Sequence, residues 1–527
     1  MQPKNTFFLF SVVSVSLILF WSAYWSMAIY LFFLILPIIA IGFYDIFQKK
    51  HTILRLYPVI GHIRYLFEAI RPEIQQYFVE SDINGTPVSR EFRTLVYQRA
   101  KGVRDTRPFG TVFDVYRDGY EWINHSLSPT DVHQVSSNTM FGGGSCDKPY
   151  LASALNISAM SYGALSKTAI EALNLGAKLG GFAHNTGEGG LSPYHLKHGG
   201  DIIWQIGTGY FGCRDQNGEF SELLFTEKAA QDVVKMIEIK LSQGAKPGHG
   251  GILPAAKLTE EIAHIRHVPM GADVVSPAAH TEFSSPIGLL EFVSRLRKLS
   301  GGKPVGFKLC IGKESEFFAI CKAMLKTGIT PDFITIDGGE GGTGAAPVEL
   351  TNSVGMPLKD ALVFVNNTLI GIGLRDKIRL IASGKSLSAF HLLRLLALGA
   401  DTVNAARAMM FALGCIQARH CNTDKCPTGI ATQDPARYKA LDVPIKSKRV
   451  ANYHASIIHN LHELIAAVGL SNSNELSLEH INHRVQGTLI KSYAELYPPT
   501  AKGVYLDPTK IPRIYKKHWE NSTAERW

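Results

Sequence analysis

The amino-terminal region contains the longest apolar run of the 527-residue chain. Between residues 7 and 43 no residue is charged and nearly all are apolar. The run is longer than the apolar core of a signal peptide and ends in no small-residue cleavage site. Since one membrane span needs about 20 residues, the run predicts either one long tilted helix or a two-helix hairpin that turns near residues 22–26. We favour the hairpin.

Basic residues flank this run on both sides. Lys4 precedes it, and Lys49, Lys50 and Arg55 follow it. Positively charged flanks stay on the cytoplasmic side of a membrane, so both ends of the hairpin are expected there. Residues 1–50 are therefore predicted to be a membrane anchor, with the catalytic part of the protein facing the cytoplasm.

Residues 51–150 have a mixed pattern. The segment HIRYLFEAIRPEIQQYF has apolar residues at helical spacing, and NGTPVSREFRTLVYQRAK reads as a turn followed by a helix. We interpret residues 51–150 as a helical collar against the next domain. A loosely ordered linker is the alternative, and the many aromatic residues that need burial argue against it.

Short apolar runs then alternate with helical patterns, which is typical of repeated β-α units around a parallel sheet. We expect eight strands, near residues 154–159, 181–184, 202–206, 272–276, 305–309, 333–336, 379–382 and 402–405. Eight such units form a closed TIM (β/α)8 barrel, an α/β fold, which we assign to residues 151–435. The rest, residues 436–527, contains an amphipathic helix at 447–468 and is predicted to be a carboxy-terminal helical extension.

Charge and composition exclude some classes of function. There are 54 Lys plus Arg and 45 Asp plus Glu, a formal net charge of +9, and no basic block interleaved with aromatic residues suggests a nucleic-acid partner. No strand-glycine-helix GxGxxG fingerprint marks an NAD(P)H domain. Four of the seven cysteines are scattered, and we interpret Cys146, Cys213, Cys310 and Cys321 as reduced core residues.

The other three cysteines, Cys415, Cys421 and Cys426, form the single thiol cluster of the sequence. Three converging thiolates are what an iron–sulfur cluster requires, because soft sulfur ligands hold iron well. The alternatives are small buried side chains, a disulfide between two of them, or a zinc site that includes His420.

The surrounding string GCIQARHCNTDKCPTGIATQDP resembles the cluster-binding segment of the flavin domain of glutamate synthases. The resemblance extends through SAMSYGALS, AHNTGEGG, GAKPGHGG and DGGEGGTGAAP, in the family's order. It implies an FMN held by the TIM barrel and a 3Fe-4S cluster bound by Cys415, Cys421 and Cys426.

The resemblance also implies flavin contacts. Without it, the turn at Met160 and Ser161 is a plain connector in which Ser166 caps the next helix. Lys308 lies inside an apolar strand and therefore needs a partner, unless its ammonium reaches solvent. The phosphate-binding loops depart from the family's glycine stretches and offer Lys385 and Arg407 instead. The predicted cofactor-binding residues are Met160, Ser161, Gln205, Lys308, Gly338, Gly339, Gly341, Gly342, Thr343, Gly384, Lys385 and Arg407.

Two residues are candidates for catalysis by the same resemblance. Glu188 matches an acid that links ammonia delivery to the flavin, and Lys246 matches a lysine that contacts the carboxylate of 2-oxoglutarate. His249 and His280 are candidate substrate-binding residues, although a satisfied structural histidine is an equal alternative for His280. His249 and Ile252 replace residues that serve the substrate in the family, so the keto acid stays open.

The implied reaction is the reduction of 2-iminoglutarate, formed from 2-oxoglutarate and ammonia, to glutamate, with electrons passed from the cluster to FMN. Expected partners are an electron donor such as ferredoxin or another redox subunit, and a separate amidotransferase subunit that supplies ammonia. Two alternatives stay open: an FMN-dependent oxidoreductase of another amino or hydroxy acid, and a membrane electron-transfer subunit without its own substrate.

Overall fold

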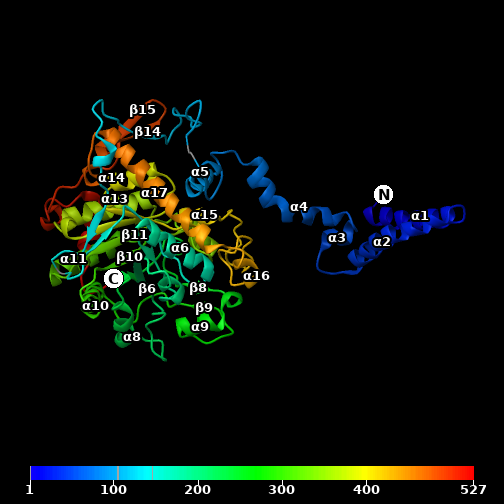
Figure 1. Ribbon diagram of the computed structural model, residues 1–527, viewed down its shortest axis with the longest axis horizontal. Coiled ribbons are helices and arrows are strands. Elements are labelled where there is room, and N and C mark those ends of the chain that lie inside the picture. Colours follow the sequence, from blue (N-terminus) through cyan, green and yellow to red (C-terminus); the bar gives the residue numbers. More distant parts are fainter. Residues whose placement is uncertain (1, 104–105, 145) are drawn as a thin grey trace. The chain divides into compact units, whose positions relative to one another are not determined.

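The computed structural model describes residues 2–103, 106–144 and 146–527. The chain divides into two compact units, residues 1–90 and residues 91–527, each of which is described by itself. The first contains the apolar run and the second the predicted barrel (Figure 1).

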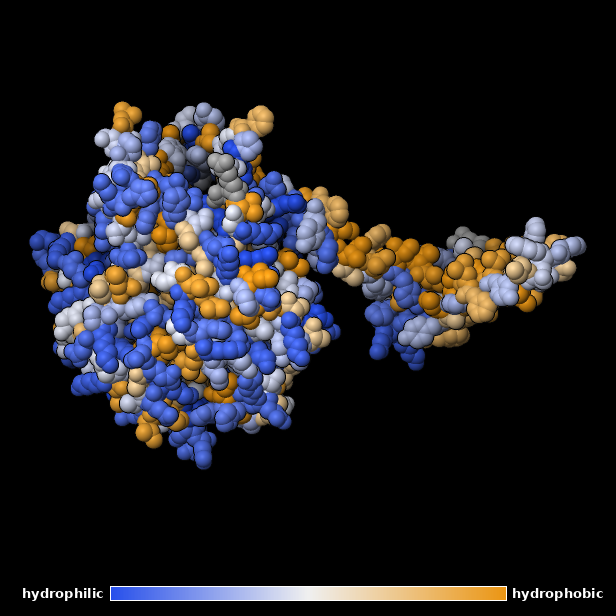
Figure 2. Space-filling model, viewed as in Figure 1, coloured by the Kyte–Doolittle hydropathy of each residue, from blue (hydrophilic) through white to orange (hydrophobic). Residues whose placement is uncertain are grey.

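The apolar run forms two helices. α1 (Pro3–Ser22) ends at a turn, after which the 3-10 helix η1 (Ser26–Leu31) leads directly into α2 (Phe32–Phe47). The rings of Phe7 and Phe43 lie 5.6 Å apart, so the two helices run antiparallel. Each span is long and apolar enough to cross a membrane, by length and composition alone, and apolar side chains gather on their surface (Figure 2). The apolar run thus forms two helices and not one long helix.

Three short helical elements complete the first unit: α3 (Thr52–Leu56), α4 (Gly61–Ile74) and the π-helical turn η2 (Gln75–Val79). Asp45, near the end of α2, is fully buried. Its carboxylate accepts hydrogen bonds from the Val59 amide (2.9 Å) and the His62 ring (2.8 Å). This contact fixes the end of α2 to the start of α4, and residues 51–90 of the predicted collar belong to this first unit.

The second unit is built on a closed parallel barrel of eight strands, which confirms the predicted TIM fold (Figure 1). The strands, in order around the barrel, are β4 (Leu155–Ile157), β5 (His184–Asn185), β6 (Ile202–Ile206), β7 (Val234–Lys240), β10 (Val305–Leu309), β11 (Phe333–Asp337), β12 (Arg379–Ser383) and β13 (Thr402–Ala405). The larger surrounding helices are α6 (Lys167–Gly180), α8 (Glu222–Ala229), α10 (Pro286–Leu299), α11 (Glu314–Thr327), α13 (Leu358–Gly371), α14 (Ala389–Ala397) and α17 (Val443–Val468).

One predicted strand is wrong. The fourth barrel strand is β7, not residues 272–276, which contain β9 (Val274–Val275) paired antiparallel with β8 (Ile252–Leu253) outside the barrel. The sequence of β7, VKMIEIK, carries three charged residues and so does not read as a buried strand. Glu238 and Lys240 are nevertheless buried, because both lie on the inner side of the barrel.

The amino end of the barrel is filled by apolar side chains. A core cluster joins β6, β7, β11 and β12 to the antiparallel pair β2 (Thr139–Phe141) and β3 (Tyr150–Ala152); its buried members are Phe141, Ala152, Ala183, Ile203, Met236, Phe333 and Ile381. The Thr139 hydroxyl donates to Asp401 O (3.1 Å), which holds this pair at the start of β13. The open end that remains is at the carboxyl ends of the strands, where TIM-barrel active sites lie.

The carboxy-terminal region is not helical throughout. α17 packs along α6, and Gly176 of α6 allows this close approach because a Cβ there would lie 2.7 Å from Val450. β14 (Ile481–Gln486) and β15 (Leu489–Ser492) form a hairpin that pairs with β1 (Glu121–Ile123). The remaining elements are α5 (Arg90–Lys101), η3 (Val132–Gln134), α7 (Pro193–Leu196), η4 (Ala255–Lys257), α9 (Glu260–Arg266), α12 (Val348–Ser353), η5 (Arg375–Lys377), α15 (Arg407–Leu413), α16 (Pro435–Tyr438), η6 (Ser473–Glu475), η7 (Leu478–His480), α18 (Tyr493–Leu496), η8 (Val504–Leu506) and α19 (Arg513–Asn521).

Candidate functional site

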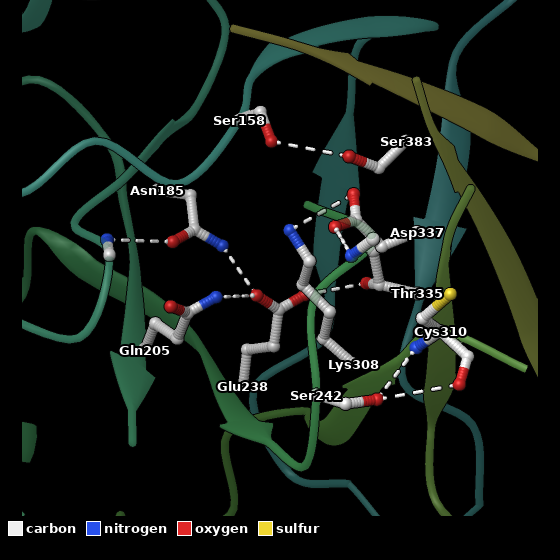
Figure 3. A network of polar contacts seen from close by, with 12 residues as sticks. Ser158, Asn185, Gln205, Glu238, Ser242, Lys308, Cys310, Thr335, Asp337 and Ser383 are labelled. Atoms are coloured by element: carbon white, nitrogen blue, oxygen red, sulfur yellow. Dashed lines mark hydrogen bonds and ion pairs between the residues drawn. The ribbon is translucent and has the colours of Figure 1, made fainter. Parts of the chain in front are cut away.

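A buried carboxylate organises the polar layer inside the barrel (Figure 3). Glu238 of β7 is 0% exposed. Its Oε1 accepts hydrogen bonds from the side-chain amides of Asn185 and Gln205, both at 2.7 Å. Its Oε2 accepts a hydrogen bond from the Thr335 hydroxyl at 2.5 Å. Four strands are thus joined at one carboxylate, and the predicted cofactor residue Gln205 is held in a fixed orientation.

Lys308 of β10 has the partner that its burial required. Its Nζ lies 3.3 Å from Oδ1 of Asp337, at the end of β11, and both side chains are almost fully buried. Oδ2 of Asp337 also accepts a hydrogen bond from the Gly244 amide at 2.7 Å. The ammonium therefore stays inside the bowl at the carboxyl end of the barrel, rather than reaching solvent (Figure 3).

The loop after β4 lies against the loop after β5. Met160 is buried, and its carbonyl oxygen is 3.2 Å from the His195 ring. Gly187 has a φ of +63°, and a Cβ there would lie 3.0 Å from the amide of Ser161. Ser166 caps α6 by accepting a hydrogen bond from the Ala169 amide, as expected. The loops after β4 and β5 are thus closely packed near Ser161, an arrangement that suits the binding of a flat ring system.

Two cations lie on the loops after β12 and β13. Burial lowers the pKa of Lys385, and the nearby Arg407 lowers it further. Burial also lowers the pKa of Arg407, whose guanidinium donates to Glu340 O at 3.3 Å. Within the described residues neither cation forms a side-chain ion pair. A Cβ at Gly342 would lie 1.8 Å from the guanidinium of Arg407, so the glycine leaves space for that group beside the loop after β11.

A polar atom nearby also lacks a partner. Oδ1 of Asn404, at the carboxyl end of β13, is buried without a hydrogen bond among the described residues. Its register neighbour Ser383 contacts the Ser158 hydroxyl at 3.3 Å. Unpaired cations and an unpaired buried acceptor at one end of the barrel fit a bound group with a phosphate and hydrogen-bond donors, as FMN has.

Glu188, on the loop after β5, lies among three cations. Its Oε1 is 2.9 Å from Nζ of Lys240. Burial raises the pKa of Glu188, but the charges of Lys240, Lys246 and Arg266 outweigh this effect, so its pKa lies below the usual value. A Cβ at Gly251 would lie 2.1 Å from Oε1, so the glycines of GAKPGHGG make room for this carboxylate. Glu188 is therefore ionised at neutral pH.

The two other cations are also buried. Lys246 is 1% exposed, and its Nζ donates to Ala345 O at 3.2 Å. Burial lowers its pKa to about 8, although Glu188 opposes the shift. Arg266 of α9 donates to Tyr162 O at 3.1 Å, and burial lowers its pKa to about 10. Three cations against one carboxylate give this group an excess of positive charge.

A small cavity adjoins this group. It has a volume of about 10 Å³, close to the minimum that holds one water molecule. Its polar lining includes Glu188, Thr208, Lys240 and His249. The predicted residue His249 is half-buried, and its Nδ1 contacts Gly250 O at 2.8 Å. A molecule of the size of water or ammonia thus has space beside the Glu188 carboxylate.

Both ring nitrogens of His280 have hydrogen-bond partners. Its Nδ1 contacts the Tyr210 hydroxyl at 3.0 Å and its Nε2 contacts Lys240 O at 2.9 Å. Burial lowers its pKa to about 4, so the ring is neutral. This geometry corresponds to the structural alternative, in which His280 holds the backbone of β7 beside Glu188.

The three clustered cysteines are free thiols on the irregular segment after α15. Burial raises the pKa of Cys415 to about 12, and the charges of Cys421 and Cys426 raise it as well, so the three sulfurs are within electrostatic range of one another. The pKa of Cys426 is lowered, because hydrogen bonds from Thr428 and from nearby backbone amides outweigh burial.

The cysteines are not already arranged as metal ligands. Among the residues that the structure describes, no three His, Cys, Asp or Glu side chains are grouped as metal ligands, and His420 is exposed. The donor chemistry still fits iron, because three soft sulfurs share one loop and one of them is stabilised as a thiolate. The other four cysteines are free thiols; Cys213, Cys310 and Cys321 are buried as expected, whereas Cys146 is only partly buried and is not a core residue.

The sequence did not indicate four buried residues: Glu238 of the polar layer, Lys240 and Arg266 beside Glu188, and Lys257, whose Nζ donates to Cys421 O at 3.2 Å. Glu238 and Lys240 lie on the strand that was not recognised. A signal was present, since Met236, Glu238 and Lys240 alternate with Ile237 and Ile239, which is the period of a strand. Lys257 is the last residue of η4 and Arg266 the last residue of α9, both beyond GAKPGHGG in the chain. Nothing local in the sequence predicts their burial.

Comparisons with known proteins cover most of the chain. A family described as a conserved region in glutamate synthase matches residues 124–471. The chain is 42% identical to the glutamate synthase large subunit-like protein YerD of Bacillus subtilis, over 84% of this chain and 92% of that protein. It is 38% identical to the archaeal glutamate synthase [NADPH] of Methanocaldococcus jannaschii, over 61% of this chain and 60% of that protein.

Solved structures match this chain at low sequence identity and with low TM-scores. A mutant flavocytochrome b2 with pyruvate bound matches with a TM-score of 0.42 and 11% identity, over 83% of this chain and 92% of that one.

Proposed function

This chain belongs to the glutamate synthase family, and from that premise we propose that it reduces 2-iminoglutarate, formed from 2-oxoglutarate and ammonia, to glutamate. The family consists of oxidoreductases that act on CH–NH2 donors, and the chain is a glutamate synthase-like flavoprotein. When bound, FMN supplies hydride chemistry and a 3Fe-4S cluster supplies single electrons to it.

The observation that carries this proposal is the group of Lys240, Lys246 and Arg266 around Glu188, next to a cavity of about 10 Å³. The substrate 2-oxoglutarate has two carboxylates, and the excess positive charge of this group favours a dianion. Lys246 and Arg266 are the cations that do not contact Glu188 within 4.0 Å in the described part of the chain, so they are available to a substrate carboxylate.

Glu188 has a different role in this proposal. As an ionised carboxylate it accepts hydrogen bonds but donates none. In the adjoining cavity it therefore orients ammonia toward the keto carbon and takes up a proton as the carbon–nitrogen bond forms. Lys240 keeps it ionised at a separation of 2.9 Å, and His280 positions Lys240 by binding its carbonyl oxygen.

The cofactor residues have matching roles. Lys308, held by Asp337, places a positive charge inside the bowl, where it would stabilise negative charge on a bound flavin ring. Lys385 and Arg407 would hold the phosphate, and Met160, Ser161, Gln205 and the glycine loop Gly338, Gly339, Gly341, Gly342 and Thr343, with Gly384, would line the ring and ribityl chain. Cys415, Cys421 and Cys426 would hold the cluster.

We further propose that α1 and η1–α2 anchor the enzyme in a membrane, with the catalytic unit in the cytoplasm. The support is the length and composition of both helices and the basic flanks on the same side of the hairpin. Electrons would come from ferredoxin or another redox subunit, and ammonia either free or from a separate amidotransferase subunit.

A reoxidation assay tests the reaction. The full chain is purified in detergent, its flavin is reduced until the yellow colour is bleached, and candidate acceptors are added without oxygen. Recovery of the colour with 2-oxoglutarate plus ammonia, but with neither alone, and formation of glutamate would support the proposal. Recovery with another keto acid would favour a related oxidoreductase, for which His249 in the cavity lining is the reason to test. No recovery with any acceptor would favour an electron-transfer subunit.

The Glu188→Gln variant adds a test of mechanism. The amide keeps the size of the side chain but accepts no proton, so reoxidation by 2-oxoglutarate and ammonia should slow by about 10²–10⁴-fold. Flavin content should stay unchanged. An unchanged rate would remove Glu188 from the reaction.

A further inference from the structure

Lys257 is a buried cation that the proposed reaction does not use. It ends η4, in the loop between β8 and α9, and is 2% exposed. Its Nζ donates to two backbone carbonyl oxygens, that of Ala164 and that of Cys421 (3.2 Å). No side-chain ion pair neutralises it among the described residues. Asp424, Cys421 and Cys426 are within electrostatic range of it, so a positive charge is buried close to two of the three cysteines.

The two carbonyl groups belong to different parts of the site. Ala164 lies on the loop after β4, four residues beyond the predicted flavin contact Met160, whereas Cys421 is a predicted cluster ligand. Gln433 joins the same two segments, because its Nε2 donates to Gly163 O (3.0 Å) and Leu165 O (2.9 Å). Lys257 and Gln433 together hold the cysteine segment against residues 163–165.

We propose that Lys257 is a positioning residue that makes the cluster easier to reduce and holds it beside the flavin loop. The inference rests on the proposed cluster at Cys415, Cys421 and Cys426. Three thiolates carry negative charge, and each electron that the cluster accepts adds another. A cation buried within a few ångströms stabilises the reduced form more than the oxidised form, because charges interact strongly where water is excluded. Burial and local charge are known to set such potentials.

Cations and anions nearby have opposing effects. Asp424 lies on the cysteine segment, where its carboxylate accepts a hydrogen bond from the Gln433 amide at 2.7 Å, and its charge disfavours reduction. Arg266 is the other cation close to Lys257, but its guanidinium binds Tyr162 O on the flavin side. Arg437 also contacts the cysteine segment, because it donates to Lys425 O at 3.4 Å, but its Nε lies 3.2 Å from the Asp434 carboxylate, which offsets its charge. Lys257 is the buried cation that contacts Cys421 itself.

Three variants at this position separate charge from hydrogen bonding. Lys257→Met loses both, Lys257→Gln keeps donors without the charge, and Lys257→Arg keeps the charge. Lys303→Met is the matched control: Lys303 is 4% exposed and also donates to two carbonyl groups, of Ala229 and Gln231, but it lies just before β10 at the amino end of the barrel.

The measurement is a redox titration of the detergent-purified full chain, followed by the electron paramagnetic resonance of the cluster, with iron, sulfide and flavin contents. Lys257→Gln and Lys257→Met should make reduction of the cluster about tenfold less favourable, a fall of about 59 mV for one electron. Lys257→Arg and Lys303→Met should stay within about threefold of the wild type.

Each possible outcome either supports or overturns the proposed role of Lys257. An unchanged potential in Lys257→Gln, with full iron content, would overturn the proposal while leaving the proposed function intact. If the Gln and Met variants lose iron while the Arg variant retains it, the charge is needed to hold the cluster, which supports the proposal. Loss of iron in all three, Arg included, would overturn it. A wild type without iron would refute the cluster itself, which is a separate failure.

Discussion

The buried carboxylate of Glu238 gives a prediction about stability that does not depend on any cofactor. Substitution by methionine keeps a side chain of similar length but removes the acceptor of three hydrogen bonds. Asn185 and Gln205 would then keep buried amide N–H groups without partners, while the Thr335 hydroxyl can rotate. Substitution by glutamine is the matched control, because its oxygen accepts from both amides and its NH2 group donates to Thr335.

The magnitude follows from the two amide donors. Leaving a buried donor unsatisfied costs about 1–3 kcal/mol, so Glu238→Met should lower the free energy of unfolding by about 2–6 kcal/mol. Glu238→Gln should lower it by about 1 kcal/mol or less, since every contact keeps a partner. The total stability of a domain is about 5–15 kcal/mol, so the methionine variant should be severely weakened.

Urea-induced unfolding followed by far-ultraviolet circular dichroism measures this difference. Both variants are compared without added FMN and with saturating FMN, because a bound ligand raises the apparent stability and its loss must not be counted as a loss of fold. If Glu238→Met and Glu238→Gln differ by less than about 1 kcal/mol without FMN, the reasoning about unsatisfied donors is wrong.

Four further predictions concern the proposed site and anchor. Burial holds the pKa of Lys246 at about 8, so its ammonium is present below that pH and is lost above it. The KM for 2-oxoglutarate should therefore rise about tenfold per pH unit above pH 8. The Lys246→Met variant should have a high KM at every pH, without this dependence. Cys421→Ser should lose iron and electron transfer into the flavin but keep the flavin, and full iron content in this variant would refute the ligand assignment. Arg407→Ala and Lys385→Ala should each weaken FMN binding about 10–100-fold in a fluorescence titration, since a hydrogen bond to a charged group contributes about 1.5–3 kcal/mol; Lys313→Ala, on an exposed loop, should not. The full chain should stay in the membrane pellet after an alkaline carbonate wash, whereas a chain without residues 2–50 should be released, and recovery of both in the pellet would contradict the anchor.

The sequence by itself determined the outline of the fold. Seven of the eight barrel strands overlap short, mainly apolar segments between turn signals, although β5 itself is His184–Asn185. Burial of apolar surface favours a place for these segments in the interior. The apolar run between residues 7 and 43 is long enough for two helices of about 20 residues, so its length indicated the two-helix form without any tertiary contact. The glycine motifs marked the loops where backbones approach closely, as Gly250 does against the backbone of Ser276.

Tertiary structure decided which charged residues are buried and with which partners. Lys308 was recognisable as buried, but its partner Asp337 lies 29 residues away on the next strand, and only closure of the barrel brings the two within 3.3 Å. The polar pattern of β7 hid a barrel strand, because Glu238 and Lys240 are shielded from water by strands distant in the sequence. Hydrophobic periodicity predicts the local secondary structure, because it depends only on residues that are neighbours along the chain. A polar side chain inside a closed barrel is satisfied by groups from other strands, so its burial and its role arise only when the fold forms.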